Sequence, residues 1–556
     1  RKEVKKINEI EIGGKIFKFP DTNKWRCAWA ENFGLNLALK IPEKVDEKVI
    51  LEYTEKYGFF SGEEGCCLKF CMVPEKRYYD INYCRAPRRK KEIIISPDDA
   101  WEEIKKICTE NDVDICSVEA AEFFERGGTI HPHLHLPDVK SVISIGIQVP
   151  GENESNGEFL WALRRILNYT AFDIAHYLDI GGYSAITGTN INDILVAEKI
   201  GIYKGNRMFC TILTSANLGK GMFFRKAKGT KNISKDRLKD FCIEAGADIV
   251  GVFNVKRFET FKKEFEKKVK IPEEREIVVD KGQYYGHYVP EVRREPLSLK
   301  SPDDWLKGAR TVIVIGLHFP SSVVDYAKVT PAETTGPYVF SQAQTLIFLK
   351  DIAVKVIRYL NTCGYKGVFT TDLTGLASQV LMKSRGDIPD MSANLYPAIL
   401  AGLAYPGLHG YPITKRYGTR QRFIAVVTDL SLENDTIPLM RYACQRCEKP
   451  CISCCPARAI SKKVVKIRIE GREFYIPSID QFSCDWAKRY GLIGEEGLKY
   501  YGIETDVPLP RNKKAEEVVK AINKVNWGVQ KRHANICEEC IRVCPEKGGE
   551  NGKEKD

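Results

Sequence analysis

The chain has 556 residues, of which 43% are hydrophobic and 29% charged, with 25 Phe and 25 Tyr. This composition excludes a largely disordered chain, and the length predicts three or four domains of ~150 residues each. Lys and Arg (85) outnumber Asp and Glu (74), so the net charge is +11. We interpret most of this charge as a solvated surface. No nucleic-acid-binding motif accompanies it, so we do not expect a nucleic-acid partner.

Residues 1–30 contain no apolar stretch typical of a secretory signal. The longest uncharged stretch, Leu395 to Thr414, is interrupted repeatedly by Pro and Gly, so it predicts no membrane-spanning helix. Nine of the 19 Cys follow residue 440, at spacings typical of metal ligands rather than of a disulfide framework. We therefore expect a soluble protein in a reducing, cytoplasmic compartment.

Residues 1–95 are irregular and predict an N-terminal extension with short strands near Glu9–Phe19. The spacing of its cysteines fits no standard metal motif, so we interpret them as ordinary thiols, with a further metal site as the alternative. These residues are Cys66, Cys67, Cys71 and Cys84. A helix is predicted to begin at Ser96-Pro97-Asp98-Asp99, which is a typical helix start.

The middle of the chain contains an internal repeat. Val139–Pro150 reads like Ala309–Pro320, and both are apolar runs typical of buried strands. Two further pairs keep the same order: Val113–Val118 with Ala247–Val252, and Tyr177–Tyr183 with Tyr359–Tyr365. We therefore predict two related α/β units, at 96–235 and 236–435, followed by a Cys-rich module at 436–556.

The Cys-rich module resembles a two-cluster ferredoxin. In that pattern three closely spaced Cys bind one [4Fe–4S] cluster, and a Cys before Pro binds the other. The first predicted ligand set is Cys444, Cys447, Cys451 and Cys544. The second is Cys455, Cys484, Cys537 and Cys540. Cys454 competes with Cys455, although Pro456 favours Cys455; zinc ligands or buried free thiols are the other interpretations.

The partner of these clusters is predicted to lie in the preceding α/β unit. That part of the chain contains no Gly-x-Gly-x-x-Gly after a strand and no Walker loop, which argues against a dinucleotide or ATP site. A flavin or a corrinoid remains.

The choice between these cofactors follows from a resemblance. It is carried by three segments and one residue before the Cys motifs: Ala401–His409, Ile413–Gly418, Val426–Leu430 and Arg422. Together with the lone Cys484 and with Gly182–Asn190, they resemble the corrinoid-dependent reductive dehalogenases and the related epoxyqueuosine reductases. The resemblance implies nitroreductase-like α/β units, the second of which binds a base-off cobalamin; the first is degenerate, and whether it also binds a cofactor stays open. It also implies Co(I) chemistry on a carbon–halogen or carbon–oxygen bond of a small molecule, with electrons from a ferredoxin-like or other low-potential donor.

The resemblance places the corrinoid beside a Gly-rich segment and nearby basic residues. The predicted cofactor-binding residues are Gly402, Leu403, Gly407, His409, Gly410, Ile413, Lys415, Arg416 and Arg422. A Tyr beside a cation donates the proton in the dehalogenases, and an Asp does so in the epoxide reductases. The candidates for this role are Tyr338, Tyr396, Asp372 and Asp390.

Two departures from the family pattern concern the substrate. Ala404-Tyr405 stands where the family has Gly-Glu, and His409 stands where a basic residue is usual. An epoxyqueuosine reductase-like enzyme acting on tRNA is one alternative. A non-catalytic iron–sulfur electron-transfer subunit is the other. The sequence does not predict the leaving group or the oligomeric state.

Overall fold

The structure is a computed structural model that describes residues 92–125, 130–225, 232–280, 289–326, 336–376, 391–438, 443–488, 490, 492–493, 507–524, 539–546 and 548. Before residue 92 it describes five short strands, β1 (Glu9–Ile12), β2 (Lys15–Lys18), β3 (Leu37–Leu39), β4 (Phe59–Ser61) and β5 (Phe70–Met72). The strands predicted near Glu9–Phe19 are therefore confirmed as the β1–β2 hairpin. Of the N-terminal cysteines, Cys71 lies in β5, whereas Cys66, Cys67 and Cys84 lie outside the described residues.

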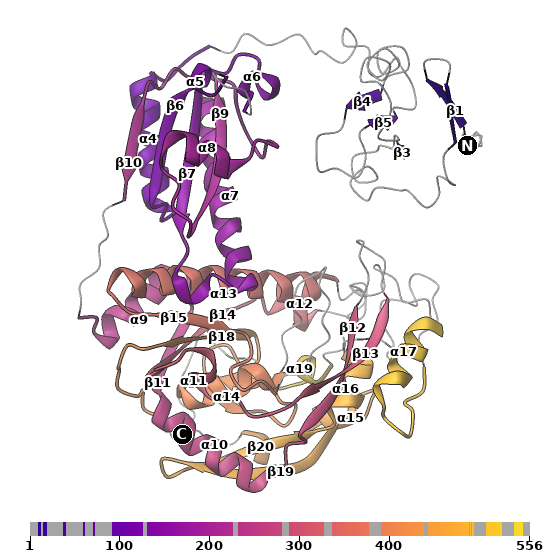
Figure 1. The fold of residues 1–556 in the computed structure, drawn as a ribbon. Coiled ribbons are helices and arrows are strands. Elements are labelled where there is room, and N and C mark those ends of the chain that lie inside the picture. Colours follow the sequence, from indigo (N-terminus) through magenta and orange to yellow (C-terminus); the bar gives the residue numbers. More distant parts are fainter. Residues whose placement is uncertain are drawn as a thin grey trace. The chain divides into compact units, whose positions relative to one another are not determined.

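The chain forms two compact units. One consists of residues 1–96 with 179–183 and 189–192; the other contains nearly all of the remaining elements, including both large sheets. The fold class is mixed α/β with several sheets, as predicted from the alternation of helices and strands (Figure 1). Among the described helices, none is both long and apolar enough to cross a membrane.

The first large sheet is antiparallel and has five strands in the order β10-β6-β7-β9-β8. Its strands are β6 (Ile115–Ala120), β7 (Ser141–Gln148), β8 (Ala185–Thr187), β9 (Arg207–Thr214) and β10 (Gly221–Phe224). The helices around it are α4 (Pro97–Glu110), α5 (Ala121–Glu125), α6 (Pro132–His135), η3 (Gly151–Asn153), α7 (Gly157–Ile180) and α8 (Asp193–Ile200). The helix start at Pro97 and the buried strand within 139–150 are both confirmed.

The second large sheet is also antiparallel, with the strand order β11-β14-β18-β15. Its strands are β11 (Ile249–Asn254), β14 (Thr311–His318), β15 (Gly367–Thr370) and β18 (Gln421–Thr428). The accompanying helices are α9 (Lys235–Glu244), α10 (Val255–Lys268), α11 (Pro302–Trp305), α12 (Ser322–Asp325), α13 (Gly336–Thr362) and α14 (Met391–Leu400). β18 is buried along its whole length because helices cover both of its faces.

The two sheets match each other beyond strand order. In the first, the Asp114 carboxylate accepts a hydrogen bond from the Gln148 amide (2.6 Å). In the second, Asp248 accepts one from the His318 amide at the equivalent place (2.7 Å). The clearest difference is the connection to the long central strand: residues 188–206 precede β9, whereas the much longer 371–420 precedes β18.

A glycine in each central strand makes room for an aromatic ring. A Cβ atom on Gly316 would lie 2.6 Å from both Phe423 and Ile249, and one on Gly146 would lie 2.6 Å from Phe209. We expect Gly316→Val to lower the free energy of unfolding by about 1–3 kcal/mol through overpacking, although Val favours strands. Urea unfolding followed by circular dichroism measures this loss. Gly205→Ala is the control, since its Cβ would meet nothing within 4 Å; equal stability of the two variants would contradict the prediction.

Three further antiparallel strand pairs and several short helices complete the described fold. The strands are β12 (Glu274–Asp280), β13 (Pro290–Pro296), β16 (Ala404–Pro406), β17 (Pro412–Thr414), β19 (Ile460–Ile469) and β20 (Arg472–Ile479). The helices are η4 (Ala443–Gln445), α15 (Pro450–Ser453), α16 (Gln481–Lys488), α17 (Ala515–Lys524) and α19 (Glu539–Arg542).

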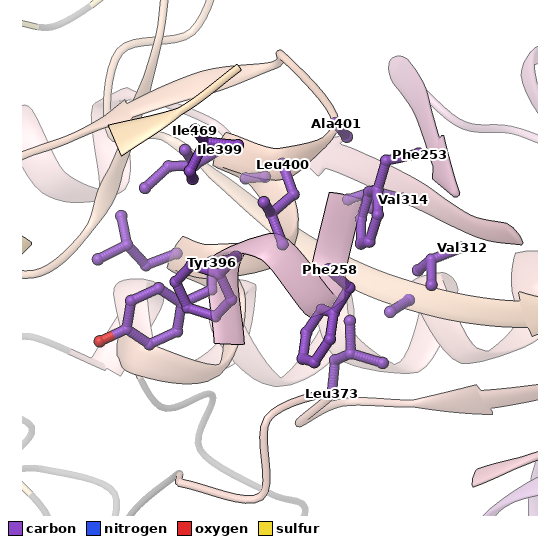
Figure 2. Close-up of a cluster of buried hydrophobic side chains, with 14 of the residues drawn as sticks. Phe253, Phe258, Val312, Val314, Leu373, Tyr396, Ile399, Leu400, Ala401 and Ile469 are labelled. Atoms are coloured by element: carbon purple, nitrogen blue, oxygen red, sulfur yellow. The ribbon is translucent and has the colours of Figure 1, made fainter. Parts of the chain in front are cut away.

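The hairpin β19–β20 shares one apolar core with the second sheet. Ile467, Ile469 and Phe474 from the hairpin pack in the same buried cluster as Phe258 of α10 and Leu400 of α14. Figure 2 shows Ile469 beside Ile399 and Leu400 in this cluster. Helix α14 leads directly into the Gly-rich segment, so this core fixes where that segment begins.

Candidate functional site

The first predicted set of cluster ligands comes together in the structure. Burial, and then the thiolates of Cys444, Cys544, Cys454 and Cys447, raise the pKa of Cys451 to about 12. Such electrostatic influence falls with distance, so these sulfur atoms are near neighbours. Helices α15 and α19 contact one another. They thereby bring Cys451 close to Cys544, which lies more than 90 positions later in the chain.

The second set is assembled around Cys540. Cys540 and Cys484 both pack against a buried cluster made of Phe319, Val324, Tyr338, Tyr411 and Ile541. We call this group the Tyr338 cluster. Cys540 also packs, together with Cys455, against Leu408, Cys451 and Ile460. Cys537 lies outside the described residues.

The β19–β20 hairpin explains how Cys455 and Cys484 meet. The Ala459 amide donates to the Cys455 sulfur (3.3 Å), and the Asp480 amide donates to the Ala459 carbonyl (3.0 Å). The Cys484 amide then donates to the Asp480 carbonyl (2.9 Å). The two cysteines therefore stand at the two ends of one hairpin, although 28 residues separate them in the sequence.

The neighbouring thiols Cys454 and Cys455 differ in their hydrogen bonds. The Cys455 sulfur accepts a backbone N–H, and so does the Cys447 sulfur, from Lys449 (3.3 Å). Backbone N–H bonds to cysteine sulfur are a usual feature of iron–sulfur sites. The Cys454 thiol instead donates to the Cys451 carbonyl (3.6 Å). This difference favours Cys455 as the ligand.

The donor sets described above consist of thiols alone. Among the described residues, no three Cys, His, Asp or Glu side chains form a group suited to one ion. A four-iron cluster binds each thiolate at a different iron, so its ligands stand further apart. The thiol-only donor sets described above fit such a cluster.

Two buried tyrosine–cation pairs lie beside the second set. The Arg422 guanidinium donates to the Tyr338 hydroxyl (3.0 Å) and lies over the Tyr411 ring (4.8 Å). The Lys488 ammonium donates to the Tyr411 hydroxyl (2.7 Å). Tyr338, Arg422, Tyr411 and Lys488 are all at most 4% exposed. Cation–phenol hydrogen bonds of this kind stabilise a phenolate and so help a tyrosine to give up its proton.

The contacts of two other proton-donor candidates, Tyr396 and Asp372, indicate that these residues stabilise the fold. Tyr396 packs against Phe261 (ring centroids 5.2 Å apart) and Phe265 (5.4 Å), and Figure 2 shows it among apolar side chains. The Asp372 carboxylate accepts bonds from the Thr374 hydroxyl (3.1 Å) and the Gly375 amide (2.9 Å), and so holds the turn after β15. Asp390 lies outside the described residues.

The Gly-rich segment packs closely against its own chain. Gly402 has a left-handed φ of 71°, and a Cβ there would lie 2.5 Å from the Thr436 carbonyl. A Cβ on Gly407 would lie 2.3 Å from the His409 imidazole. Internal packing therefore already requires both glycines. Leu403 is half-buried against the core, Gly410 is buried, and Ile413 is buried in β17.

The basic candidates separate into buried and exposed groups. Lys415 and Arg416 are exposed, whereas Arg422 is buried. Burial, and then Arg420 and Arg422, lower the pKa of His409 to about 3, so its imidazole is neutral. Its Nδ1 atom accepts the Tyr411 amide (3.1 Å), which leaves the proton on Nε2.

Several buried polar atoms near Tyr338 have no hydrogen-bond partner in the described part of the chain. They are the His409 Nε2 and both polar side-chain atoms of Gln342, which lies one turn after Tyr338 on α13. Buried polar groups are normally paired, so such atoms mark places where a bound group can supply the partner. A corrinoid carries many peripheral amides, and these residues fit them chemically.

A cavity of about 770 Å³ lies elsewhere in the same unit. It is lined by residues of α4, β10, α9 and α13, among them Arg225, Phe241 and Tyr359, and by none of the predicted site residues.

Four residues of this site are not among those predicted from the sequence: Tyr411, Lys488, Arg420 and Gln342. A signal existed for Lys488, because it follows Cys484 by four residues and so shares its face of helix α16. Tyr411 lies within the uncharged segment 395–414 and carried no distinguishing pattern.

Comparison with known proteins identifies the relatives of part of the chain. No family model matches it. A 171-residue alignment is 30% identical to the tetrachloroethene reductive dehalogenase of Dehalobacter restrictus, and it covers 29% of this chain and 26% of that enzyme. The enzyme of the same name from Desulfitobacterium hafniense gives the same identity and coverage. This segment is related to the reductive dehalogenases. This match confirms the resemblance to the superfamily that the sequence motifs indicate. The chain spans only about a quarter of the length of these reductive dehalogenases. These relatives are oxidoreductases.

Solved structures of the same superfamily are also similar to the chain. A catabolic reductive dehalogenase aligns over 72% of this chain and 75% of its own, at 11% identity and a TM-score of 0.30. The epoxyqueuosine reductase of Streptococcus thermophilus aligns over 41% of this chain and 53% of its own, at 17% identity and a TM-score of 0.26. Because these scores are low, the relationship rests on the sequence match.

Proposed function

We propose that the chain is a corrinoid- and iron–sulfur-dependent reductase that cleaves a carbon–halogen or carbon–oxygen bond in a small molecule. The observation that carries this proposal is that Cys484 and Cys540 of the second set pack beside a buried tyrosine–arginine pair, Tyr338 and Arg422, while Cys540 also packs against Cys451 of the first set. The sequence relationship to the reductive dehalogenases supports the same reaction class.

Two cluster sites follow from the cysteine positions. Cys444, Cys447, Cys451 and Cys544 would hold one [4Fe–4S] cluster, called cluster A below. Cys455, Cys484, Cys537 and Cys540 would hold the other, cluster B. Such clusters supply one-electron transfer, and a low-potential, ferredoxin-like protein is the proposed donor.

The corrinoid site is proposed next to the Tyr338 cluster. Gln342 and His409 would bind the corrinoid periphery through the atoms that lack partners. Bound there, a corrinoid supplies a strongly reducing cobalt centre for cleavage of the substrate bond. Leu403, Gly410 and Ile413, which are buried or half-buried, would form the packed wall of this site. Lys415 and Arg416 are exposed, so they would instead contact solvent or a protein donor.

Tyr338 is the proposed proton donor. Its Oη atom would release a proton to the product carbanion or alkoxide, and the hydrogen bond from Arg422 would stabilise the resulting phenolate. Burial of both side chains keeps water from competing for this role.

We also propose that the two large sheets arose by duplication and have the nitroreductase-like arrangement that the family implies. The shared strand order and the equivalent Asp114 and Asp248 bonds support this. Since the first unit has only residues 188–206 where the second has 371–420, it lacks a counterpart of the Gly-rich segment. We therefore propose one corrinoid site per chain, in the second unit.

Metal analysis of anaerobically purified protein, incubated with cobalamin, tests the proposed function. We expect about one cobalt and about eight irons per chain, the count for two [4Fe–4S] clusters. Eight irons without cobalt would overturn the corrinoid proposal and favour an electron-transfer subunit. Absence of both metals would overturn the whole proposal.

A further inference from the structure

A group of exposed cations borders the proposed site of cluster A. Arg446 lies between two of the cluster A ligands, and Arg458 lies three residues after Cys455. Lys462 and Lys463 lie near the start of β19. All four basic side chains are exposed. We call this group the basic surface.

Helix α15 and strand β19 bring the two ends of the basic surface together. Helix α15 begins next to Cys451 and contacts both β19 and α19. Lys462 and Lys463 occupy the irregular part of β19 between Ile460 and Val464, where the pairing with β20 shifts register. An irregularity of this kind turns side chains away from the regular ladder. The basic surface therefore lies beside the segment that carries three of the cluster A ligands.

The charge of the basic surface is not neutralised by carboxylates. Within the part of the chain that the structure describes, none of its four side chains forms an ion pair. Residues 446–463 also include Glu448 and Lys449, so the stretch has five basic residues, one acidic residue and a net charge of +4. Such a surface attracts a partner of opposite charge over about 8 Å at physiological salt.

Charges on the surrounding elements do not reverse this sign. The half-buried Glu546 accepts a hydrogen bond from the Tyr405 hydroxyl (3.1 Å). The exposed Lys415 and Arg416 add positive charge on the same side, because a Cβ on Gly548 would lie 2.4 Å from the Arg416 carbonyl. Carboxylates on the neighbouring strands and helices each have a basic partner or neighbour: Glu539 with Arg542 (2.6 Å), Glu473 with Lys466 (2.7 Å) and Arg468 (3.0 Å), Asp480 with Lys513, Asp325 with Arg420 (2.7 Å), and Asp485 with Lys488 one turn later on α16.

Cluster A is also the more distant of the two clusters from the proposed corrinoid site. The Tyr338 cluster packs against Cys484 and Cys540, which belong to cluster B, and against none of the cluster A ligands that the structure describes. An electron from outside would therefore enter at cluster A, beside the basic surface, and pass through cluster B.

We propose that the basic surface is the docking site of the electron donor, and that this donor is a small acidic protein of the ferredoxin type. The inference rests on the proposed function, because it requires cluster A to receive electrons. One electron would pass from the reduced donor to cluster A, oxidising the donor and reducing the cluster by one electron each, with no proton transferred. Electron-transfer partners bury little surface, so opposite charges would determine how often the donor meets cluster A.

Binding of an acidic plant-type [2Fe–2S] ferredoxin to the full-length, reconstituted protein tests this proposal. Titration calorimetry should show binding at low salt that weakens as salt rises, because salt screens exposed charges. The double variant Lys462→Glu and Lys463→Glu should bind about tenfold more weakly or worse, since it reverses two charges of the basic surface. Its iron content should equal that of the wild-type protein, because neither lysine is a proposed cluster ligand.

Two control variants separate docking from a general effect of charge. Lys204→Glu reverses an exposed lysine of the first α/β unit that has no ion pair among the described residues, and it should bind as the wild-type protein does. The double variant Lys462→Arg and Lys463→Arg keeps the charge and should keep the affinity.

Stopped-flow reduction of the clusters supplies a second measurement. Reduced ferredoxin should reduce the charge-reversed double variant more slowly than the wild-type protein, whereas reduced methyl viologen, a small molecule that needs no docking surface, should reduce both at similar rates. Absence of ferredoxin binding, binding that does not depend on salt, or equal affinities of the charge-reversed double variant and Lys204→Glu would overturn the inference while the iron content still supported the clusters. Absence of iron from the wild-type protein would instead overturn the proposed function.

Discussion

Replacing Cys544 by alanine is expected to remove about half of the iron, from about eight to about four atoms per chain. Cys544 is the distant member of the first ligand set, and the structure brings it next to Cys444 and Cys451. Without it, cluster A keeps three ligands on one short segment and loses the anchor from α19. Cluster B keeps all four of its proposed ligands. Iron analysis together with the visible absorption of the clusters measures the loss, and reductase activity should fall to background.

The control is Cys454→Ala. Cys454 lies close to Cys451 but donates its thiol proton to the Cys451 carbonyl, so its removal should leave about eight irons per chain. If Cys454→Ala lost iron and Cys455→Ala kept it, the two neighbouring cysteines would exchange roles. If Cys544→Ala kept all of its iron, the first ligand set would be wrong.

Tyr338→Phe should reduce turnover by about 10²- to 10⁴-fold, the usual contribution of a positioned proton donor. The substitution removes only the hydroxyl that accepts the Arg422 bond and keeps the ring that packs in the Tyr338 cluster. Cobalt and iron contents should therefore match those of the wild-type protein. Single-turnover measurements with a halogenated aromatic or alkene and a chemical reductant would show whether the loss lies in the bond-breaking and protonation steps.

Tyr396→Phe is the matched control for Tyr338→Phe. Both tyrosines are buried, but Tyr396 packs its ring against Phe261 and Phe265 in the apolar core. Its variant should keep turnover within a few-fold of the wild-type value. A large loss in Tyr396→Phe with full activity in Tyr338→Phe would move the proton donor from α13 to α14.

The strands of the two sheets could be predicted from the sequence because their signals are local, and the proposed cysteine sets depend in part on a local signal too. Runs such as 141–148 and 311–318 are apolar throughout, and buried strands require little else. Cys444, Cys447 and Cys451 lie within eight residues, so their spacing alone indicates a shared cluster. Pro456 and Pro545 added the signal that separates the two sets.

The tyrosine–cation pairs could not be predicted because they depend on distant segments. Arg422 and Tyr338 are 84 residues apart, and Lys488 and Tyr411 are 77 apart. Which basic residues enter the interior depends on where β17 ends and β18 begins, a boundary that leaves Lys415 exposed and Arg422 buried. The sequence contains no periodic pattern that distinguishes these two outcomes.

The hairpin β19–β20 has a consequence for how the protein acquires its iron. Its base is closed by backbone bonds that join Ala459, Asp480 and Cys484 and by the bond from the Ala459 amide to the Cys455 sulfur, and its strands are anchored in the core of the second sheet. These contacts are made by the polypeptide itself, through hydrogen bonds at the base and apolar side chains along the strands. In zinc fingers the metal provides much of the folding free energy; here the polypeptide itself holds Cys455 near Cys484. The apoprotein would thus hold these two ligands in place before iron and sulfide are delivered. After oxidative loss of a cluster it would regain the cluster without first having to refold.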